Sequence, residues 1–284
     1  MTINPVLAKE LKDRVRTWRS PLLITVYLGV LSLVGGFFYY TQTRFSFGGT
    51  NTLRLGIEIF GLLALLELLL IAFLTPGMTA GIISGERERQ TLPLLLVTRV
   101  SPFAVTWGKL LSAISYILLL IISSLPLFSI VFLFGGVSLL DLLKAAGVLL
   151  ATTIILGSIG IFFSAAFKRT PVAIVGAYMT TFFLMAGTLF FGIMSRELGS
   201  RVLAPGQFPS IPRILYFNPL AALGSALPGS GFIPFSGNGE FGGGPGAMPL
   251  WEGYLLTGLV IVLLTTGLTV YLIRPLRKGN RRGE

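Results

Sequence analysis

Long apolar runs, each bounded by polar or charged residues, dominate the pattern of this sequence. A helix that crosses the roughly 30 Å hydrocarbon core of a bilayer needs about 20 mainly apolar residues. Six runs meet this requirement, so we predict an all-α polytopic membrane protein with six transmembrane helices. The predicted spans are Pro21–Tyr40, Leu55–Ile83, Phe103–Phe134, Leu139–Phe167, Pro171–Ser195 and Gly253–Ile273.

Short polar signals predict where three of these helices begin. Ser101-Pro102 and Thr170-Pro171 each offer a capping side chain followed by Pro at the first helical position. Ser138 with Asp141 three residues later resembles a capping box.

A long segment, residues 196–252, separates the fifth and sixth spans and is rich in Gly, Pro and aromatic residues. Within it, Ile214–Leu227 is apolar but too short to cross a bilayer, and Pro219 interrupts it. We expect an interfacial or re-entrant segment there. The rest of this outer loop is either a flexible tether with interfacial aromatics or a cap over an outward exit.

Composition supports a membrane protein and argues against most enzymes. The 284 residues are 53% hydrophobic and 12% charged, whereas a soluble domain has about a quarter charged residues. The mean hydropathy is +0.84. The chain has neither Cys nor His, which removes the usual nucleophiles, general bases and metal ligands. We therefore predict no catalytic, cofactor-binding or metal site.

The distribution of basic residues predicts the orientation in the membrane. The net charge of +11 would suggest nucleic acid in a soluble protein, but here the Lys and Arg residues flank apolar runs, so we predict no nucleic-acid partner. Most of them lie within residues 1–20, 84–109, 168–169 and 274–284. Since basic loops stay inside, both termini are predicted to be cytoplasmic, and residues 274–284 form a basic tail.

Residues 1–20 predict an amphipathic helix ahead of the 21–284 transmembrane domain. Its apolar face consists of Leu7, Leu11, Val15 and Trp18, which recur every three or four residues. Such a helix lies along the membrane surface. Its role is either an orientation anchor or a lever that contacts a cytoplasmic partner.

The segment between the second and third spans has the features of a docking element. Residues 85–89 alternate in charge as the chain leaves the second span, and residues 92–97 then suit a short apolar helix with Thr91 as its cap and Pro93 near its start. This helix is too short to span and too apolar for a free loop. We expect it to rest on the membrane or to enter a groove of a partner.

Polar and small residues inside the second span offer further candidates. Glu67 lies near the middle of the bilayer, as either a neutral carboxyl bonded to a Ser or Thr of another helix or a cavity or proton-linked residue. Gly77, Gly81 and Gly85 are spaced for close helix contact, within the subunit or between two copies. Pro76 should kink this helix.

These segments together resemble the permeases of type 2 ATP-binding-cassette (ABC) transporters. The resemblance is carried by Glu86-Arg87-Glu88, Thr91-Leu92, Leu95-Leu96, Thr98, Val100-Ser101 and Gly108-Lys109, with Asn4-Pro5-Val6-Leu7 and Phe217-Asn218-Pro219-Leu220 also similar. Three positions depart from the family pattern: Gln90 stands where Gly is usual, Pro93 where an acid is usual, and Arg99 where Pro is common.

The resemblance implies a coupling helix within residues 84–102 that contacts a cytoplasmic ATPase through Glu86, Arg87, Glu88, Thr91 and Leu92. It implies a permease dimer, most simply of two identical copies and alternatively of two related chains, in the lipid of a prokaryotic inner membrane. The chain has no phosphate-binding loop, so ATP and magnesium would be bound by the ATPase.

We therefore expect a permease subunit of an ATP-driven exporter, with an amphipathic or lipid-like cargo favoured by the apolar spans. One alternative is a secondary transporter or channel, although such proteins usually have several intramembrane ionisable residues. A second is a structural or assembly subunit of a membrane complex. A membrane enzyme is disfavoured by the missing His and Cys.

Overall fold

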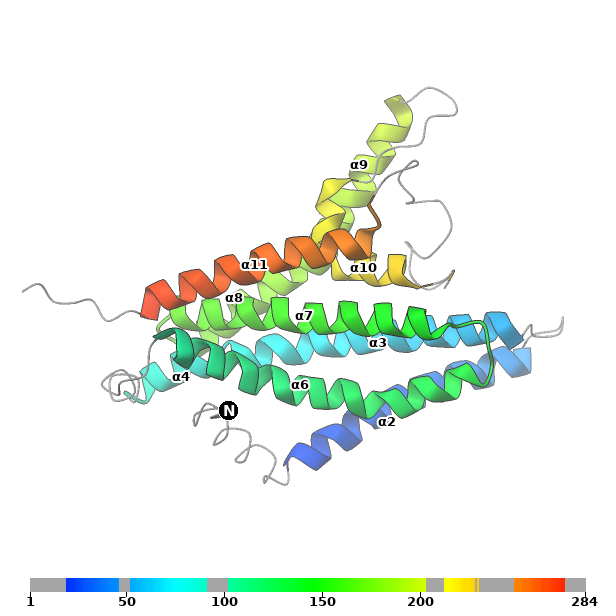
Figure 1. Cartoon of the computed structure of the whole chain (residues 1–284), viewed down its shortest axis with the longest axis horizontal. Coiled ribbons are helices and arrows are strands. Elements are labelled where there is room, and N and C mark those ends of the chain that lie inside the picture. The colour runs from blue at the N-terminus through cyan, green and yellow to red at the C-terminus, as the bar shows by residue number, and fades with distance from the viewer. Residues whose placement is uncertain are drawn as a thin grey trace, which may run out of the picture.

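Long helices lying side by side make up the fold (Figure 1). The structure, a computed structural model, describes residues 19–45, 52–90, 102–202, 212–227, 229 and 248–273, and every regular element within them is helical. In chain order the elements are α2 (Arg19–Phe45), α3 (Thr52–Thr79), α4 (Ile82–Glu88), α6 (Pro102–Phe132), α7 (Leu139–Ala166), α8 (Thr170–Phe182), the π-helical turn η1 (Phe183–Gly187), α9 (Thr188–Val202), the 3-10 helix η2 (Arg213–Phe217), α10 (Pro219–Ala226) and α11 (Leu250–Ile273).

The prediction of an all-α protein with six spans is confirmed. Six helical stretches of the described residues are long and apolar enough to cross a membrane: Pro21–Arg44, Thr52–Glu88, Thr106–Phe132, Leu139–Ala166, Thr170–Ser195 and Leu250–Ile273. The largest difference concerns the second, which was predicted to end at Ile83 but continues through α4 to Glu88. Residues 85–88 are therefore the end of a helix and not a loop.

The middle of the bundle is α7, which borders α3, α6, α8, α10 and α11. In its most apolar window 61% of the residues are buried, against 11% for the first span. The reason is that α2 packs mainly on α3 and α6 and leaves the rest of its surface exposed. Because exposed apolar side chains face lipid tails, this exposure is compatible with a span at the periphery.

Local sequence signals explain several helix ends. The predicted capping box of α7 is confirmed, with Ser138 accepting from the Asp141 amide and Asp141 accepting from the Ser138 amide. α6 begins at Pro102, as predicted. The expected cap at Thr170 is wrong by one residue: Thr170 is the first residue of α8, and Arg169 occupies the cap position without a side-chain bond.

The apolar stretch Ile214–Leu227 does not form a seventh span. It folds as η2 followed by the eight-residue α10, which is packed against α7, α11 and η2. Most residues of α10 are buried inside the bundle. Figure 1 shows it beneath the start of α11, with α9 leaning away from the bundle at the same end.

Several predictions concern residues outside the described ranges. They are the amphipathic helix with Leu7, Leu11, Val15 and Trp18, the coupling residues Thr91 and Leu92, the Gly-rich part of the outer loop, and the basic tail.

Candidate functional site

The charged motif Glu86-Arg87-Glu88 lies at one end of the bundle, where four helix ends meet. These are α4, the beginning of α6, the end of α7 and the beginning of α8, and we call this region the α4 end. α4 starts without a side-chain cap of its own. Instead, Ser164 Oγ of α7 accepts from the backbone amides of Ile83 (2.8 Å) and Ser84 (2.9 Å). These amides belong to the first turn of α4, where no carbonyl of the same helix is available, so α7 caps α4 and fixes its direction.

A short ion pair links α4 to α6. Lys109 Nζ lies 2.6 Å from Glu86 Oε1. The Lys109 side chain is only 4% exposed and that of Glu86 is 24% exposed. A nearly buried ammonium is costly unless it is paired, so Glu86 makes the position of Lys109 in the bundle tolerable.

Glu88, the last residue of α4, supplies the cap that α8 does not make for itself. Its Oε1 accepts from the Thr170 backbone amide (2.7 Å) and its Oε2 accepts from the Thr170 hydroxyl (2.9 Å). A carboxylate at the first turn of a helix satisfies a free amide and interacts favourably with the helix dipole. Arg87, between the two acids, donates through Nη1 to the Phe167 carbonyl at the end of α7, at a long 3.5 Å.

The glycines of the second span face α8 within the same subunit. A Cβ built on Gly77 would lie 2.8 Å from the Tyr178 hydroxyl oxygen, and one on Gly81 would lie 3.3 Å from Thr170 Cγ2. The Tyr178 hydroxyl uses this space to donate to the Phe73 carbonyl (2.8 Å). The described contacts of Gly77 and Gly81 are thus packing contacts inside the chain.

Gln90 ends the α4 segment in a conformation that favours glycine. Its φ is +57°, and its amide donates to the Arg87 carbonyl (3.1 Å). Just after a helix, this left-handed conformation is usually adopted by Gly, which has no Cβ to clash with the backbone. The resemblance noted in the sequence likewise implies Gly at this position.

A hollow of about 250 Å³ opens beside these residues and is lined by Gly81, Ile82, Gly85, Glu86 and Arg89. The α4 end therefore combines an exposed charged surface with a rigid attachment to three other helices. Such an arrangement can transmit a force applied to α4 to α6, α7 and α8 together.

A comparison of the chain with known protein families identifies its family. The family model described as ABC-2 family transporter protein matches residues 4–273. The chain belongs to the ABC-2 transporter family. It is therefore a multi-pass permease component of an ABC transporter, and this membership implies pairing with an ABC ATPase subunit. No curated protein compared with the chain matches it.

Inside the permease, Glu67 joins three spans. The residue is 1% exposed, and Oε1 lies 3.0 Å from the Tyr27 hydroxyl of α2 and 2.7 Å from the Ser124 hydroxyl of α6. Oε2 is buried and has no hydrogen-bond partner within the described part of the chain.

Sequence reasoning gave no role to Asn218, which proves to be the central residue at the other end of the permease. Its Oδ1 accepts from the amides of Leu220 and Ala221 and so caps α10. Its Nδ2 donates to the Met185 carbonyl and the Thr188 hydroxyl, both at 2.7 Å. Met185 lies in the π-helical turn η1, where the regular hydrogen-bond ladder is interrupted. The pattern Asn-Pro before a helix could have indicated the cap, but not the bonds to the fifth span.

Proposed function

We propose that this permease is the membrane-spanning subunit of an ATP-driven exporter, and that ATP and magnesium are bound by a separate ABC ATPase subunit. The chain itself then carries no catalytic residue and no cofactor. Two copies, or this chain and a related permease, surround the transport path. The assembly lies in the cytoplasmic membrane of a prokaryote, with the α4 end and both termini in the cytoplasm, as the basic segments favour.

The observation that carries the proposal is the attachment of α4 to three other helices. Glu86 pairs with Lys109 of α6, Glu88 caps α8, and Ser164 of α7 caps α4. A closing ATPase that displaces α4 would move the cytoplasmic ends of the second, third, fourth and fifth spans as a unit. Rigid-body movement of this kind is a common route between inward-open and outward-open states. The ATPase is expected to contact Arg87, Thr91 and Leu92 and the free face of α4.

A matched pair of cysteine variants tests the orientation and the partner. The natural chain has no Cys, so Arg89→Cys at the α4 end and Arg44→Cys at the opposite end each introduce a single exposed thiol. We expect Arg89→Cys to cross-link to a co-purifying ABC ATPase and Arg44→Cys not to do so. In intact cells, a membrane-impermeant thiol reagent should label only Arg44→Cys. Labelling of Arg89→Cys from outside, or purification without any ATPase, would refute the proposal.

A second experiment separates the exporter from its alternatives. Charge reversal at Glu86 and Glu88 should abolish ATP hydrolysis that depends on the permease, because it breaks the links from α4 to α6 and α8. A structural subunit would also lose stability when the ion pair is broken, but it would have no permease-dependent ATP hydrolysis to lose. A secondary transporter would continue to move its cargo along an ion gradient after ATP is exhausted.

A further inference from the structure

Glu67 and Ser124 make three close oxygen–oxygen contacts, with Tyr27, with the Ile121 carbonyl and with each other. If Glu67 were ionised, the two hydroxyl groups would supply only two protons for these three contacts. Ser124 Oγ lies 2.7 Å from both Glu67 Oε1 and the Ile121 carbonyl, but a hydroxyl has a single proton to donate. The bond to the Ile121 carbonyl is the usual one for a Ser inside a helix. When Ser124 donates there, the contact with Glu67 needs a proton on the carboxyl.

The surroundings of Glu67 also disfavour a charge. Oε2 is buried without a donor in the described structure, and an ionised carboxylate in the hydrocarbon region is costly. The titratable group that faces it is the Tyr27 hydroxyl. Of the helices that pack on α3, α2, α6 and α7 have their charged residues in the turns toward the helix ends, while α8 and α10 have none. Among the described residues, no positively charged side chain near the middle of the bundle therefore compensates a negative charge.

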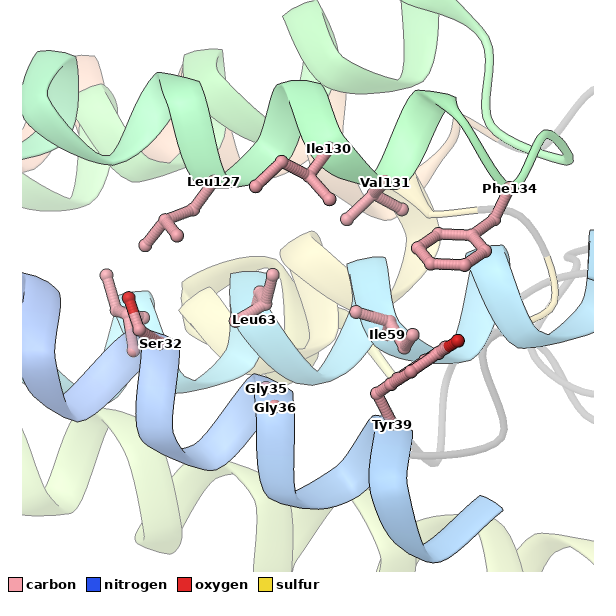
Figure 2. A pocket seen from close by; sticks show the side chains of 11 residues that line it. Ser32, Gly35, Gly36, Tyr39, Ile59, Leu63, Leu127, Ile130, Val131 and Phe134 are labelled. Carbon is pink, nitrogen blue, oxygen red and sulfur yellow. The ribbon is translucent and has the colours of Figure 1, made fainter. Parts of the chain in front are cut away.

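The position of this contact matters because the apolar packing of α2 is incomplete. A groove of about 460 Å³ separates α2, α3 and α6 and is lined almost entirely by apolar side chains. Figure 2 shows Gly35, Gly36 and Tyr39 of α2 on one side and Leu127, Ile130 and Val131 of α6 on the other.

The groove begins one helical turn from the polar contact. Leu31, Leu63 and Leu127, which line it, lie three or four residues from Tyr27, Glu67 and Ser124 respectively. Farther along α2, the next polar link is the bond from Gln42 Nε2 to Glu58 Oε2, at a long 3.3 Å.

We propose that Glu67 is held as a neutral carboxylic acid and is the positioning residue that fastens the first span to the second and third. The acid, protonated on Oε1, donates to Ser124, and the same oxygen accepts from Tyr27, so one side chain bonds α6 and α2 one helical turn from the groove that interrupts their packing. In the transport cycle, the first span then moves together with α3, whose continuation α4 meets the ATPase. This last consequence depends on the proposed function, whereas the protonation and the fastening do not.

The protonation is tested on the purified full-length permease in lipid nanodiscs. An infrared difference spectrum between the natural protein and Glu67→Gln at neutral pH should contain the carbonyl band of a carboxylic acid. Glu58→Gln, at the end of the same span and paired with Arg54, is the matched control and should lose carboxylate bands instead. Carboxylate bands in the Glu67→Gln difference would overturn the proposal.

The fastening is tested by distance. Leu33→Cys on α2 and Ile122→Cys on α6, both exposed on the outside of the bundle and outside the groove lining, carry spin labels in an otherwise cysteine-free chain. Tyr27→Phe and Glu67→Ala should lengthen and broaden the distance distribution between them. Glu67→Gln, whose amide nitrogen at the position of Oε1 has two protons to donate to the Tyr27 and Ser124 hydroxyls, should preserve it. An unchanged distribution in Tyr27→Phe and Glu67→Ala would overturn the positioning role, and both measurements are made without an ATPase, so they stand apart from the proposed function.

Discussion

The ion pair between Glu86 and Lys109 makes an asymmetric prediction. Replacing Glu86 with Gln removes the Glu86 carboxylate from an ammonium that is 4% exposed, whereas replacing Lys109 with Met removes the ammonium from a carboxylate that is 24% exposed. The more buried charge loses more solvation when its partner is removed. Glu86→Gln should therefore destabilise the permease more than Lys109→Met.

The magnitude follows from the separation and the burial. At the observed 2.6 Å, Coulomb's law with an effective dielectric constant of about 20 gives an attraction of roughly 6 kcal/mol. Desolvation of the two ions offsets a large part of this attraction, and breaking a buried pair costs about 3–5 kcal/mol. We expect about 3 kcal/mol of lost unfolding free energy for Glu86→Gln and about 2 kcal/mol for Lys109→Met, because Glu86 keeps partial contact with water.

The assay is a double-mutant cycle on unfolding in mixed micelles of mild detergent and SDS. The double variant Glu86→Gln with Lys109→Met should lose less unfolding free energy than the two single variants together, by about 1.5 kcal/mol or more. Arg54→Met with Glu58→Gln is the control, since this pair includes an Arg side chain that is 81% exposed and should couple by at most about 1 kcal/mol. The reasoning is refuted if the Glu86 and Lys109 losses are additive, or if Lys109→Met is the more damaging change.

Three further changes have defined outcomes in the same unfolding assay. Gln90→Gly should stabilise the permease by about 1 kcal/mol by relieving the positive φ, whereas Gln90→Ala should give no gain; equal effects would contradict the strain argument. Asn218→Ala removes the α10 cap and the bonds to η1, so we expect a loss of about 2–4 kcal/mol, and a loss below about 0.5 kcal/mol would contradict these contacts. Gly77→Ala should destabilise the natural chain by about 1 kcal/mol, because the Tyr178 hydroxyl lies 2.8 Å from the new Cβ, but it should stabilise the Tyr178→Phe variant, where the nearest ring atom is 3.8 Å away. A change in unfolding free energy of the same sign in both backgrounds would show that the hydroxyl is not the obstacle.

Polar contacts join the helices of the permease at two places, the α4 end and the surroundings of Asn218. At the α4 end, charged side chains link the helix ends that face the proposed ATPase. At the other end, Asn218 ties the buried α10 to the π-helical turn of the fifth span. α8 lies between these junctions, capped by Glu88 at its start and continuous with η1 at its end. A displacement of α4 would therefore be passed along α8 to the opposite half of the bundle.

Features that depend on a single segment could be predicted from the sequence. The six spans were recognised because each run of apolar residues is long enough to enter the hydrocarbon core by itself. The capping box at Ser138 and Asp141 was recognised because both partners lie in one turn of the same helix. The short Ile214–Leu227 stretch was excluded as a span by its length and by Pro219.

The features that make up the candidate functional site depend on contacts between segments. Glu88 meets Thr170 across 82 positions of sequence, and Asn218 meets Met185 across 33. Such contacts depend on how two helices pack, which is set by the small residues and the ridges of side chains on both surfaces. The sequence of one segment alone does not specify this packing. The sequence alone therefore determined that the chain crosses the membrane six times and which residues carry charge. Only the tertiary structure decided which helix ends those charges join. The reason is that insertion of a span depends on the apolar length of that segment alone, whereas a polar side chain needs a hydrogen-bond or ion-pair partner that lies on another segment.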